Sequence, residues 1–383
     1  MHLTMSSLKI AFYCPNKPLS HPHPSGDLSI ARNLHHALTA MGHDCREIVQ
    51  FRSRWFWQSG GGWFKAAASM VKAYRRMQSF RPDLWLTYHS YYKSPDLVGQ
   101  AVSRLSQIPY VLFQPMYSTR RRKTSRTRLG FTLNRMALKT AAAVFTNNRN
   151  DLEALRRIVP SERITYLAPG INPEVFQPNE AARVRIRRQY GIAAEATVLM
   201  TAARFRPGVK VESLACLFRA LARLNGRELR FTLLVVGDGP MASLVRELAE
   251  TFVPGKTVFT GGVAPGDMAQ YYSAADLFAF PGIGESLGMV YLEAQACGLP
   301  VVALDSPGVA QVVAAGRSGL LVPHDTGEAM AEAIRGFLAD RGKRGAWGRE
   351  GQQYVREQHN ALRNAHQLSR KLEQIARRGL PRR

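Results

Sequence analysis

The sequence contains no long apolar run. The nearest candidate, residues 129–145, is interrupted by Asn134, Arg135 and Lys139. A membrane-spanning helix needs about 18 or more consecutive apolar residues, so we expect none. The first 15 residues carry one lysine and too short an apolar run for a secretory signal peptide. These absences predict a cytoplasmic protein.

Cysteine is also scarce, and motifs for holding metals are missing. The four cysteines, Cys14, Cys45, Cys216 and Cys297, show no C-x-x-C spacing. A disulfide framework or a zinc site is therefore not indicated, and buried free thiols are expected. No D-x-D motif is present to hold Mg²⁺ against phosphates. We expect no metal and no tightly bound cofactor.

Acidic residues are few, with 28 Asp and Glu against 52 Lys and Arg, a net charge of +24. The excess is uneven: residues 1–175 hold 25 basic residues against 9 acidic ones, and residues 341–383 hold 12 against 3. Residues 176–340 are nearly neutral, with 15 against 16. Two basic segments predict an anionic partner, either a membrane surface or a nucleic acid.

The length of 383 residues suits two domains rather than one. Short apolar runs alternate with helical stretches, which predicts α/β domains with mostly parallel sheets. In the first half these runs cover residues 9–14, 84–87, 110–113 and 142–146. The proline-rich segment 168–178 marks the boundary, so we assign residues 1–175 and 176–355 to the two domains. Residues 356–383 are left as a C-terminal helix with a basic tail.

The most informative stretch is residues 280–302, FPGIGESLGMVYLEAQACGLPVV. Glu285 and Glu293 are eight residues apart, so one regular helix would turn them about 80° from each other. We therefore place Glu285 in a loop and a helix over Met289–Cys297. The free N–H groups of its first turn form an anion site. A phosphate held there would have a carboxylate at each end, which suits a nucleotide sugar.

The E-x7-E spacing and the flanking LEAQACGLPVV resemble the retaining GT-B glycosyltransferases of glycosyltransferase family 4. Three upstream segments resemble the same family: 202–210 with its arginine and lysine, 231–239 (FTLLVVGDG), and 258–280 ending in ADLFAFP. The resemblance runs in order over residues 197–322. It implies a GT-B fold, with two Rossmann-like domains whose parallel sheets face a central cleft, and a C-terminal helix that crosses back to the first domain.

The same resemblance implies roles in binding the donor. Glu285 would contact hydroxyls of the donor sugar and Glu293 the ribose, with the amides of Leu287 and Gly288 near the distal phosphate. The other donor-binding positions are expected at Ser286, Gly237 and Val263. The alternative for the two glutamates is a helix cap and a solvated helix acid. An unpaired carboxylate in the apolar run around Glu293 would be costly, which favours a function.

Arg204 and Lys210 follow a strand-like run, and loops at the carboxyl ends of strands line ligand crevices in α/β proteins. Two cations can neutralise a diphosphate leaving group without a metal. We therefore predict catalytic roles for both. The alternative is two ordinary surface charges in a basic chain.

In the first domain, Gly26 could let a loop approach the donor phosphate, while the adjacent Asp27 could instead cap the next helix. His89 follows a predicted strand at a position where related enzymes often have an acceptor-site histidine. It is either catalytic or hydrogen-bonded inside a loop. A second histidine common in relatives is absent, with Gln114 at the corresponding place. The acceptor proton is then expected to pass to the leaving phosphate.

The densest basic run is residues 120–128, RRRKTSRTR, which begins with Arg120, Arg121, Arg122 and Lys123. The aromatic segment with Trp55 and Trp57 also lies among basic residues. Cations beside aromatics suit an acceptor or an anionic membrane interface. The alternatives are a solvated basic loop and core aromatics.

Together these patterns predict an α/β, GT-B, retaining and metal-independent hexosyltransferase. It would use a UDP- or GDP-sugar and a lipid-linked or cell-surface glycan acceptor, and its basic segments favour a peripheral position on the inner face of the cell membrane. One alternative is a soluble enzyme with a small-molecule acceptor. Another is an α/β nucleic-acid-binding protein, although no recognisable reader module is present.

Overall fold

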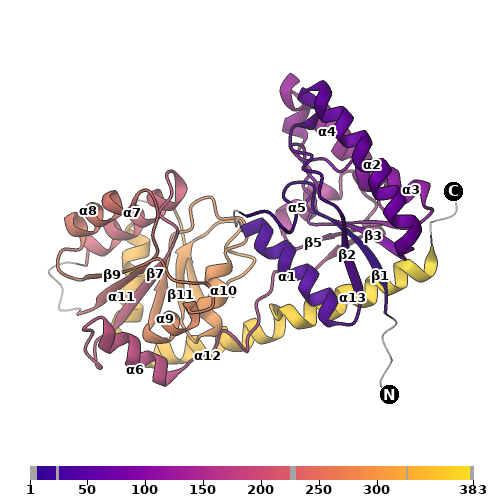
Figure 1. The fold of residues 1–383 in the computed structure, drawn as a ribbon. Helices are drawn as coiled ribbons and strands as arrows, with labels where there is room; N and C mark the ends of the chain where they lie inside the picture. The colour runs from indigo at the N-terminus through magenta and orange to yellow at the C-terminus, as the bar shows by residue number, and fades with distance from the viewer. Residues whose placement is uncertain (1–6, 23–25, 225–229, 325–326, 380–383) are drawn as a thin grey trace, which may run out of the picture. The chain divides into compact units, whose positions relative to one another are not determined.

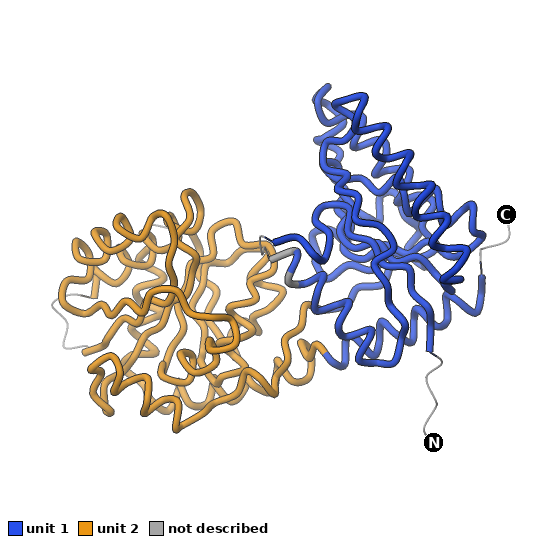
Figure 2. The backbone as a smooth tube through the Cα atoms, viewed as in Figure 1, with its two compact units in different colours: residues 1–168, 362–383 blue, residues 169–361 orange. Residues whose placement is uncertain are grey.

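The computed structural model describes residues 7–22, 26–224, 230–324 and 327–379 (Figure 1). The chain divides into two compact units (Figure 2). Unit 1 comprises residues 1–168 and 362–383, and unit 2 comprises residues 169–361. Each unit contains one six-stranded sheet.

The sheet of unit 1 is parallel, with the strand order β2-β1-β3-β4-β5-β6. Its strands are β1 (Lys9–Tyr13), β2 (Asp44–Val49), β3 (Leu84–Tyr88), β4 (Tyr110–Phe113), β5 (Ala143–Thr146) and β6 (Ile164–Tyr166). Every residue of β3, β4 and β5 is buried, as expected for strands covered on both faces. The strand order reverses between β1 and β3, and ligands of such sheets bind at this point, beyond the carboxyl ends of the strands.

Helices surround this sheet. They are α1 (Gly26–Ala40), α2 (Gly60–Phe80), α3 (Val98–Leu105), α4 (Ser125–Thr140), α5 (Arg149–Leu155) and α13 (Ala361–Arg378), with short 3-10 turns at Phe56–Gln58, Thr119–Arg122 and Ser161–Arg163. The C-terminal helix α13 packs against this unit, because Leu368 and Leu372 belong to the same buried cluster as Ile10 and Leu86. In Figure 1, α2 and α4 extend together away from the sheet of unit 1.

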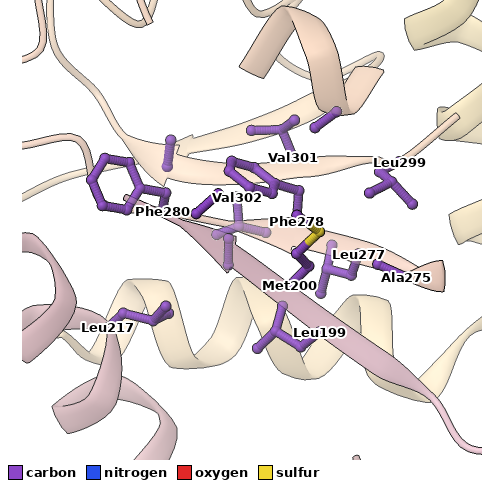
Figure 3. Close-up of a cluster of buried hydrophobic side chains, with 14 of the residues drawn as sticks. Leu199, Met200, Leu217, Ala275, Leu277, Phe278, Phe280, Leu299, Val301 and Val302 are labelled. Carbon is purple, nitrogen blue, oxygen red and sulfur yellow. The ribbon is translucent and has the colours of Figure 1, made fainter. Parts of the chain in front are cut away.

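The sheet of unit 2 is also parallel, in the order β12-β11-β10-β7-β8-β9. Its strands are β7 (Val198–Ala202), β8 (Thr232–Val236), β9 (Thr257–Gly261), β10 (Leu277–Ala279), β11 (Val301–Leu304) and β12 (Gly319–Val322). Figure 3 shows part of the core that they form, with Met200, Phe278 and Val301 packed together. The strand order reverses between β7 and β10, which is where a ligand site is expected.

The helices of unit 2 are α6 (Glu180–Gln189), α7 (Val209–Ala222), α8 (Ala242–Phe252), α9 (Met268–Ala274), α10 (Met289–Ala296), α11 (Glu328–Ala339) and α12 (Arg341–Gln358). The helix predicted over Met289–Cys297 is thus present as α10. α10 ends at Ala296, and Gly298 follows it with a φ of 80°, a conformation that favours glycine.

The boundary between the units lies seven residues before the predicted one. Residues 169–175 belong to unit 2 because the chain pairs there with the segment after α12. The Ile171 N–H donates to the His359 carbonyl at 2.9 Å, and the Ala361 N–H donates to the Ile171 carbonyl at 2.9 Å. The last segment of unit 1 likewise starts at residue 362 rather than 356, because α12 continues to Gln358 within unit 2.

All four cysteines are buried and free, as predicted. Among the described residues, no helix has the length and apolar character needed to cross a bilayer. Within the same residues, no group of three or more His, Cys, Asp or Glu side chains is arranged to hold a metal ion.

Candidate functional site

Glu285 lies in the loop between β10 and α10, as the sequence predicted. Three glycines shape this loop: Gly282, Gly284 and Gly288 have φ values of 71°, 66° and 58°. Residues with a side chain rarely adopt these positive φ values. At Gly288 a Cβ atom would also lie 2.5 Å from the ring of Tyr291. The loop therefore needs glycine at these positions to present Glu285 before the start of α10.

Two neighbouring segments hold the Glu285 loop. The Ile283 N–H donates to the Ser213 hydroxyl on α7 at 3.0 Å. The Gln311 amide donates to the Ser286 carbonyl at 2.8 Å. Gly308 allows a closer approach, since a Cβ there would lie 1.9 Å from the Glu285 carbonyl oxygen. Glu285 is thus fixed by α7 on one side and by the segment after β11 on the other.

Lys210, the second residue of α7, forms an ion pair with Glu285. Its ammonium group also lies 5.2 Å from the centre of the Phe280 ring. Its side chain is 33% exposed and that of Glu285 is 19% exposed. An ion pair with this access to water contributes little net stability, so a ligand can replace it at low cost. The sequence predicted both residues at one site but did not predict their direct contact.

Glu293 lies on α10, where its carboxylate accepts a hydrogen bond of 2.9 Å from the Tyr272 hydroxyl. Burial raises the pKa of Glu293 to about 7, and the Tyr272 hydrogen bond opposes this rise. The other carboxylate oxygen has no partner among the described residues. This environment agrees with the expectation that a carboxylate in this apolar run is costly. Tyr272 was missed, because nothing in the sequence separates it from an ordinary core tyrosine.

The remaining predicted donor-binding residues follow neighbouring strands. Arg204 comes after β7, Gly237 after β8 and Val263 after β9. Arg204 is exposed and forms no ion pair with any described residue. Gly237 allows two loops to meet, since a Cβ there would lie 1.9 Å from the Ala203 carbonyl oxygen.

Because β10, β7, β8 and β9 are neighbours in this order, their following loops share one edge of the sheet. This edge contains the point where the strand order reverses. The structure directly joins Lys210 to Glu285, and it places Arg204, Gly237 and Val263 along the same edge. Their roles remain predictions.

The residues predicted in unit 1 lie at the corresponding edge of its own sheet. His89 follows β3 and is buried, with Nδ1 3.2 Å from the Gln114 carbonyl oxygen, to which it can only donate. His89 and Gln114 have φ values of 60° and 54°, which are strained for residues with side chains. Gly26 begins α1, but the surroundings of Gly26 and Asp27 lie outside the described residues.

The aromatic and basic segments predicted to bind an anionic partner contact each other at α4 and the turn before it. The guanidinium of Arg126 lies 5.4 Å from the Trp55 ring, and that of Arg121 lies 4.5 Å from the Tyr92 ring. Trp55 and Trp57 are half-buried, and Trp57 lies against Gly130. They are therefore packed residues rather than the most exposed aromatics.

The exposed apolar side chains of this region lie one turn or more further along α2. Those with the largest exposure are Phe64 (76%), Val71 (53%), Trp63 (42%) and Tyr74 (39%). At 100° per residue, these four positions fall within one arc of about 100° on the helix. The run Arg120–Lys123 is exposed as predicted. We call the α2 and α4 helices with the Arg120–Lys123 turn the basic arm.

Residues 196–340 match the family model described as Glycosyl transferases group 1. A curated relative, the GDP-mannose-dependent alpha-(1-6)-phosphatidylinositol monomannoside mannosyltransferase of Mycobacterium tuberculosis, is 34% identical over 207 residues. That segment covers 52% of this chain and 53% of the relative. The chain thus matches about half the length of this relative.

Solved structures resemble almost the whole chain. Sucrose-phosphate synthase from Thermosynechococcus elongatus has a TM-score of 0.74 at 20% identity, covering 97% of this chain and 100% of that one. HepE of Anabaena in complex with UDP has a TM-score of 0.73 at 18% identity, covering 96% and 100%. The chain therefore has the GT-B fold, and its residues 196–340 are similar to the group 1 glycosyl transferases.

Proposed function

We propose that this protein is a retaining glycosyltransferase that moves a hexose from a nucleotide sugar to a lipid-linked or cell-surface glycan. The ion pair between Lys210 and Glu285, at the reversal point of the unit 2 sheet, carries the proposal. A cation and a carboxylate in contact match the two adjacent parts of a sugar diphosphate. The phosphates need a cation, and the sugar hydroxyls need an acceptor of hydrogen bonds.

In the proposed reaction, the donor separates this ion pair. Lys210 and Arg204 turn to the diphosphate, Glu285 accepts hydrogen bonds from the sugar, and Glu293 accepts from the ribose. The bond between the sugar C1 and the phosphate oxygen breaks while the acceptor oxygen bonds to C1 on the same face. The acceptor proton passes to the departing phosphate. No separate base is then needed, and His89 and Gln114 would orient the acceptor.

The name of the mycobacterial relative supports a GDP-sugar as the first donor to test and a phosphatidylinositol-type glycolipid as the first acceptor. The UDP complex of HepE supports testing UDP-sugars beside it. Transfer to a soluble phosphoinositol analogue but not to a lipid-linked acceptor would favour the small-molecule alternative.

Transfer is expected to need no divalent metal, because Lys210 and Arg204 supply two positive charges for the leaving diphosphate. Activity in EDTA should equal activity in Mg²⁺ or Mn²⁺. Initial rates under both conditions test this expectation. A strict requirement for added metal would show that the leaving group is neutralised differently.

The two glutamates are expected to differ in their effects. Glu285→Gln should chiefly lower turnover, because the sugar gains charge in the transition state, and Glu293→Gln should chiefly weaken donor binding, because the ribose does not change during transfer. Kinetics at saturating donor separate these effects. Wild-type activity in both variants would contradict the assignment of the donor site to these glutamates.

The raised pKa of Glu293 also predicts a pH dependence of donor binding. The ionised carboxylate accepts hydrogen bonds from both ribose hydroxyls, whereas the protonated form loses part of this capacity. Donor affinity should therefore rise with pH up to the pKa of about 7 and then level off. Titration with a GDP-sugar over this range tests the trend. Glu293→Gln should bind weakly without it, and a pH dependence retained in the variant would contradict the assignment.

The basic arm is proposed to attach the enzyme reversibly to anionic lipid. The exposed face of Phe64, Val71, Trp63 and Tyr74 can enter the headgroup region, and Arg120–Lys123 can contact the charged surface. This attachment would hold the protein at the inner face of the membrane beside a lipid-linked acceptor. Nucleic acid would use the same charge but has no need for these apolar side chains. Tight binding of nucleic acid at physiological salt, with no binding to vesicles, would favour that alternative.

A further inference from the structure

A polar cavity of about 500 Å³ lies within unit 2, at the edge of the sheet opposite the Glu285 loop. It is lined by residues that precede strands, such as Thr197 before β7, Asp276 before β10 and Leu299 before β11, together with parts of α6 and α12. Because the sheet is parallel, these residues share its amino edge. The proposed donor residues follow the carboxyl ends of the same strands.

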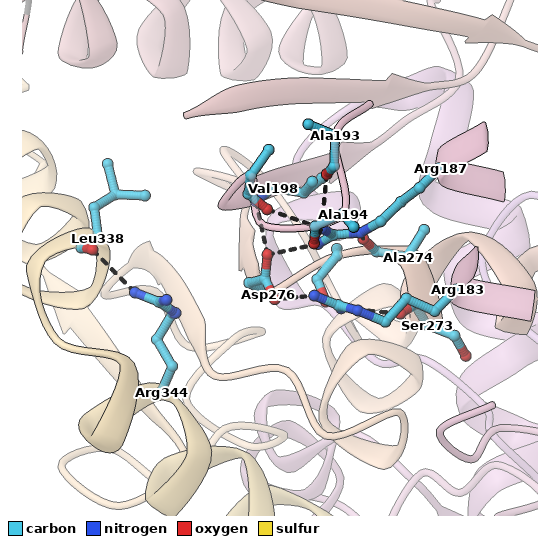
Figure 4. Close-up of polar contacts among 12 residues, drawn as sticks. Arg183, Arg187, Ala193, Ala194, Val198, Ser273, Ala274, Asp276, Leu338 and Arg344 are labelled. Atoms are coloured by element: carbon cyan, nitrogen blue, oxygen red, sulfur yellow. Dashed lines mark hydrogen bonds and ion pairs between the residues drawn. The ribbon is translucent and has the colours of Figure 1, made fainter. Parts of the chain in front are cut away.

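One carboxylate in this cavity is fully used by its neighbours (Figure 4). Asp276 pairs with Arg183 at 2.7 Å through one oxygen and with Arg187 at 2.8 Å through the other. Its second oxygen also accepts the Val198 N–H at 2.8 Å. Asp276 therefore has two guanidinium groups to balance, and it cannot neutralise further cations.

Three more arginines of α12, Arg341, Arg344 and Arg349, line the cavity and form no ion pair with a carboxylate of the described residues. Arg344 donates to the Leu338 carbonyl at 3.0 Å (Figure 4). Burial lowers its pKa, Asp276 and Asp340 oppose that effect, and Arg341 and Arg183 add to it. Arg341 and Arg349 are exposed and make no ion pair with any described residue. Glu180 and Glu195 also line the cavity, but neither pairs with these arginines in the described part of the chain.

Glycines on α12 create the hollow between these arginines. Gly345 and Gly348 line the cavity on the helix turns between Arg341 and Arg349. A Cβ on Gly348 would lie 2.1 Å from the Gly298 carbonyl oxygen, so α12 packs closely against the end of α10. The Arg349 guanidinium lies 3.6 Å from where a Cβ on Gly345 would be. Gly345 and Gly348 thus leave part of the α12 wall without side chains, beside Arg341, Arg344 and Arg349, which we call the rim arginines.

We propose that this cavity is a binding site for a phosphate monoester dianion, separate from the donor site. Guanidinium groups bind phosphate oxygens through paired, charge-assisted hydrogen bonds, and an anion would balance the cations that Asp276 leaves uncompensated. The volume accommodates a phosphate with a small organic group. The assignment does not depend on the proposed transfer reaction, since no residue of the cavity belongs to the Glu285 loop.

The test is a calorimetric titration of the full chain with inorganic phosphate and with glycerol 3-phosphate at constant ionic strength. Arg341→Gln combined with Arg349→Gln removes two rim charges without touching the buried Asp276 network. The matched control is Arg188→Gln with Arg356→Gln, which removes two exposed arginines from α6 and α12 outside the cavity. An Arg204→Ala variant reports on phosphate held at the proposed donor site instead.

The wild type, the control pair and Arg204→Ala should bind the phosphate compounds alike. The rim variant should bind them at least tenfold more weakly, since each charge-assisted hydrogen bond is worth roughly a factor of ten. A loss in Arg204→Ala with normal binding by the rim variant would place the phosphate at the donor loop and overturn the proposal. If the control pair lost phosphate binding equally, the binding would be nonspecific charge attraction and the proposal would be wrong.

A second arm distinguishes a free phosphate compound from a lipid headgroup. The rim variant and the wild type should bind equally tightly to vesicles of phosphatidylcholine with phosphatidic acid, because the cavity takes a soluble ligand and does not contribute to vesicle binding. Vesicle binding lost only in the rim variant would contradict the soluble ligand and assign the site to a headgroup.

Discussion

Lys210→Ala should lower turnover by about 10²- to 10³-fold, as expected when a charge opposite a developing phosphate anion is removed. The loss should be larger in kcat than in donor affinity, because negative charge on the leaving diphosphate grows during transfer. Arg204→Ala should behave in the same way. Initial rates with a GDP- or UDP-sugar and a glycolipid acceptor measure both variants.

A structural control is needed for this result. Lys210→Ala also removes the cation that pairs with Glu285, so its effect on the fold must be separated from its effect on transfer. Arg219→Ala, which removes an exposed cation near the other end of the same helix, should keep wild-type rates. Unchanged thermal stability of all three proteins would show that the fold is intact. Equal activity of Lys210→Ala and Arg219→Ala would contradict a role for Lys210 in transfer.

Removing the charges of the basic arm should nearly abolish attachment to anionic vesicles. Each basic residue near such a surface contributes about 1 kcal/mol, so the four exposed cations of Arg120–Lys123 contribute up to about 10³-fold in partitioning. Flotation with vesicles containing phosphatidylserine should show binding at low salt, weaker binding at high salt, and little binding when these residues are serine.

The apolar face of the arm gives a second variant. Phe64→Ser with Val71→Ser should weaken vesicle binding while leaving its salt dependence, because these two side chains contribute contact area rather than charge.

The matched control for the variant without the Arg120–Lys123 charges replaces four exposed cations outside the basic arm by serine, namely Arg104, Arg156, Arg157 and Arg370. If vesicle binding fell equally in this control, the basic arm would act only through its contribution to the net charge and not as a specific membrane surface. Binding that ignores lipid charge, or is absent at low salt, would favour a soluble acceptor.

Much of the fold could be predicted from the chain, because its signals are local. The apolar runs 84–87 and 110–113 are fully buried strands, and Gly298 follows the end of the predicted helix α10. The loop position of Glu285 followed from helix geometry alone. The domain boundary was misplaced because the pairing of Ile171 with the segment after α12 joins residues far apart in the sequence.

The internal contacts of the candidate site were not predictable in the same way. The Lys210 and Glu285 contact depends on how α7 packs against the loop after β10, and a single sequence does not specify that packing. Tyr272 donates to Glu293 from another helix, and nothing in the sequence around Tyr272 distinguishes it from an ordinary core tyrosine. The sequence drew attention to Trp55 and Trp57, which precede α2, whereas the most exposed aromatic side chain is Phe64 on α2 itself.

Hydrogen exchange with and without nucleotide sugar tests the central claim most directly. In EDTA, a GDP- or UDP-sugar should slow exchange of backbone amides in residues 203–210 and 282–293, because the phosphates accept N–H groups at the start of α10 and the loop becomes ordered around the sugar. The protection should saturate with donor concentration and weaken in Glu293→Gln. Saturable binding without protection of either segment, or no binding of either nucleotide sugar, would contradict the assignment of this loop as the donor site.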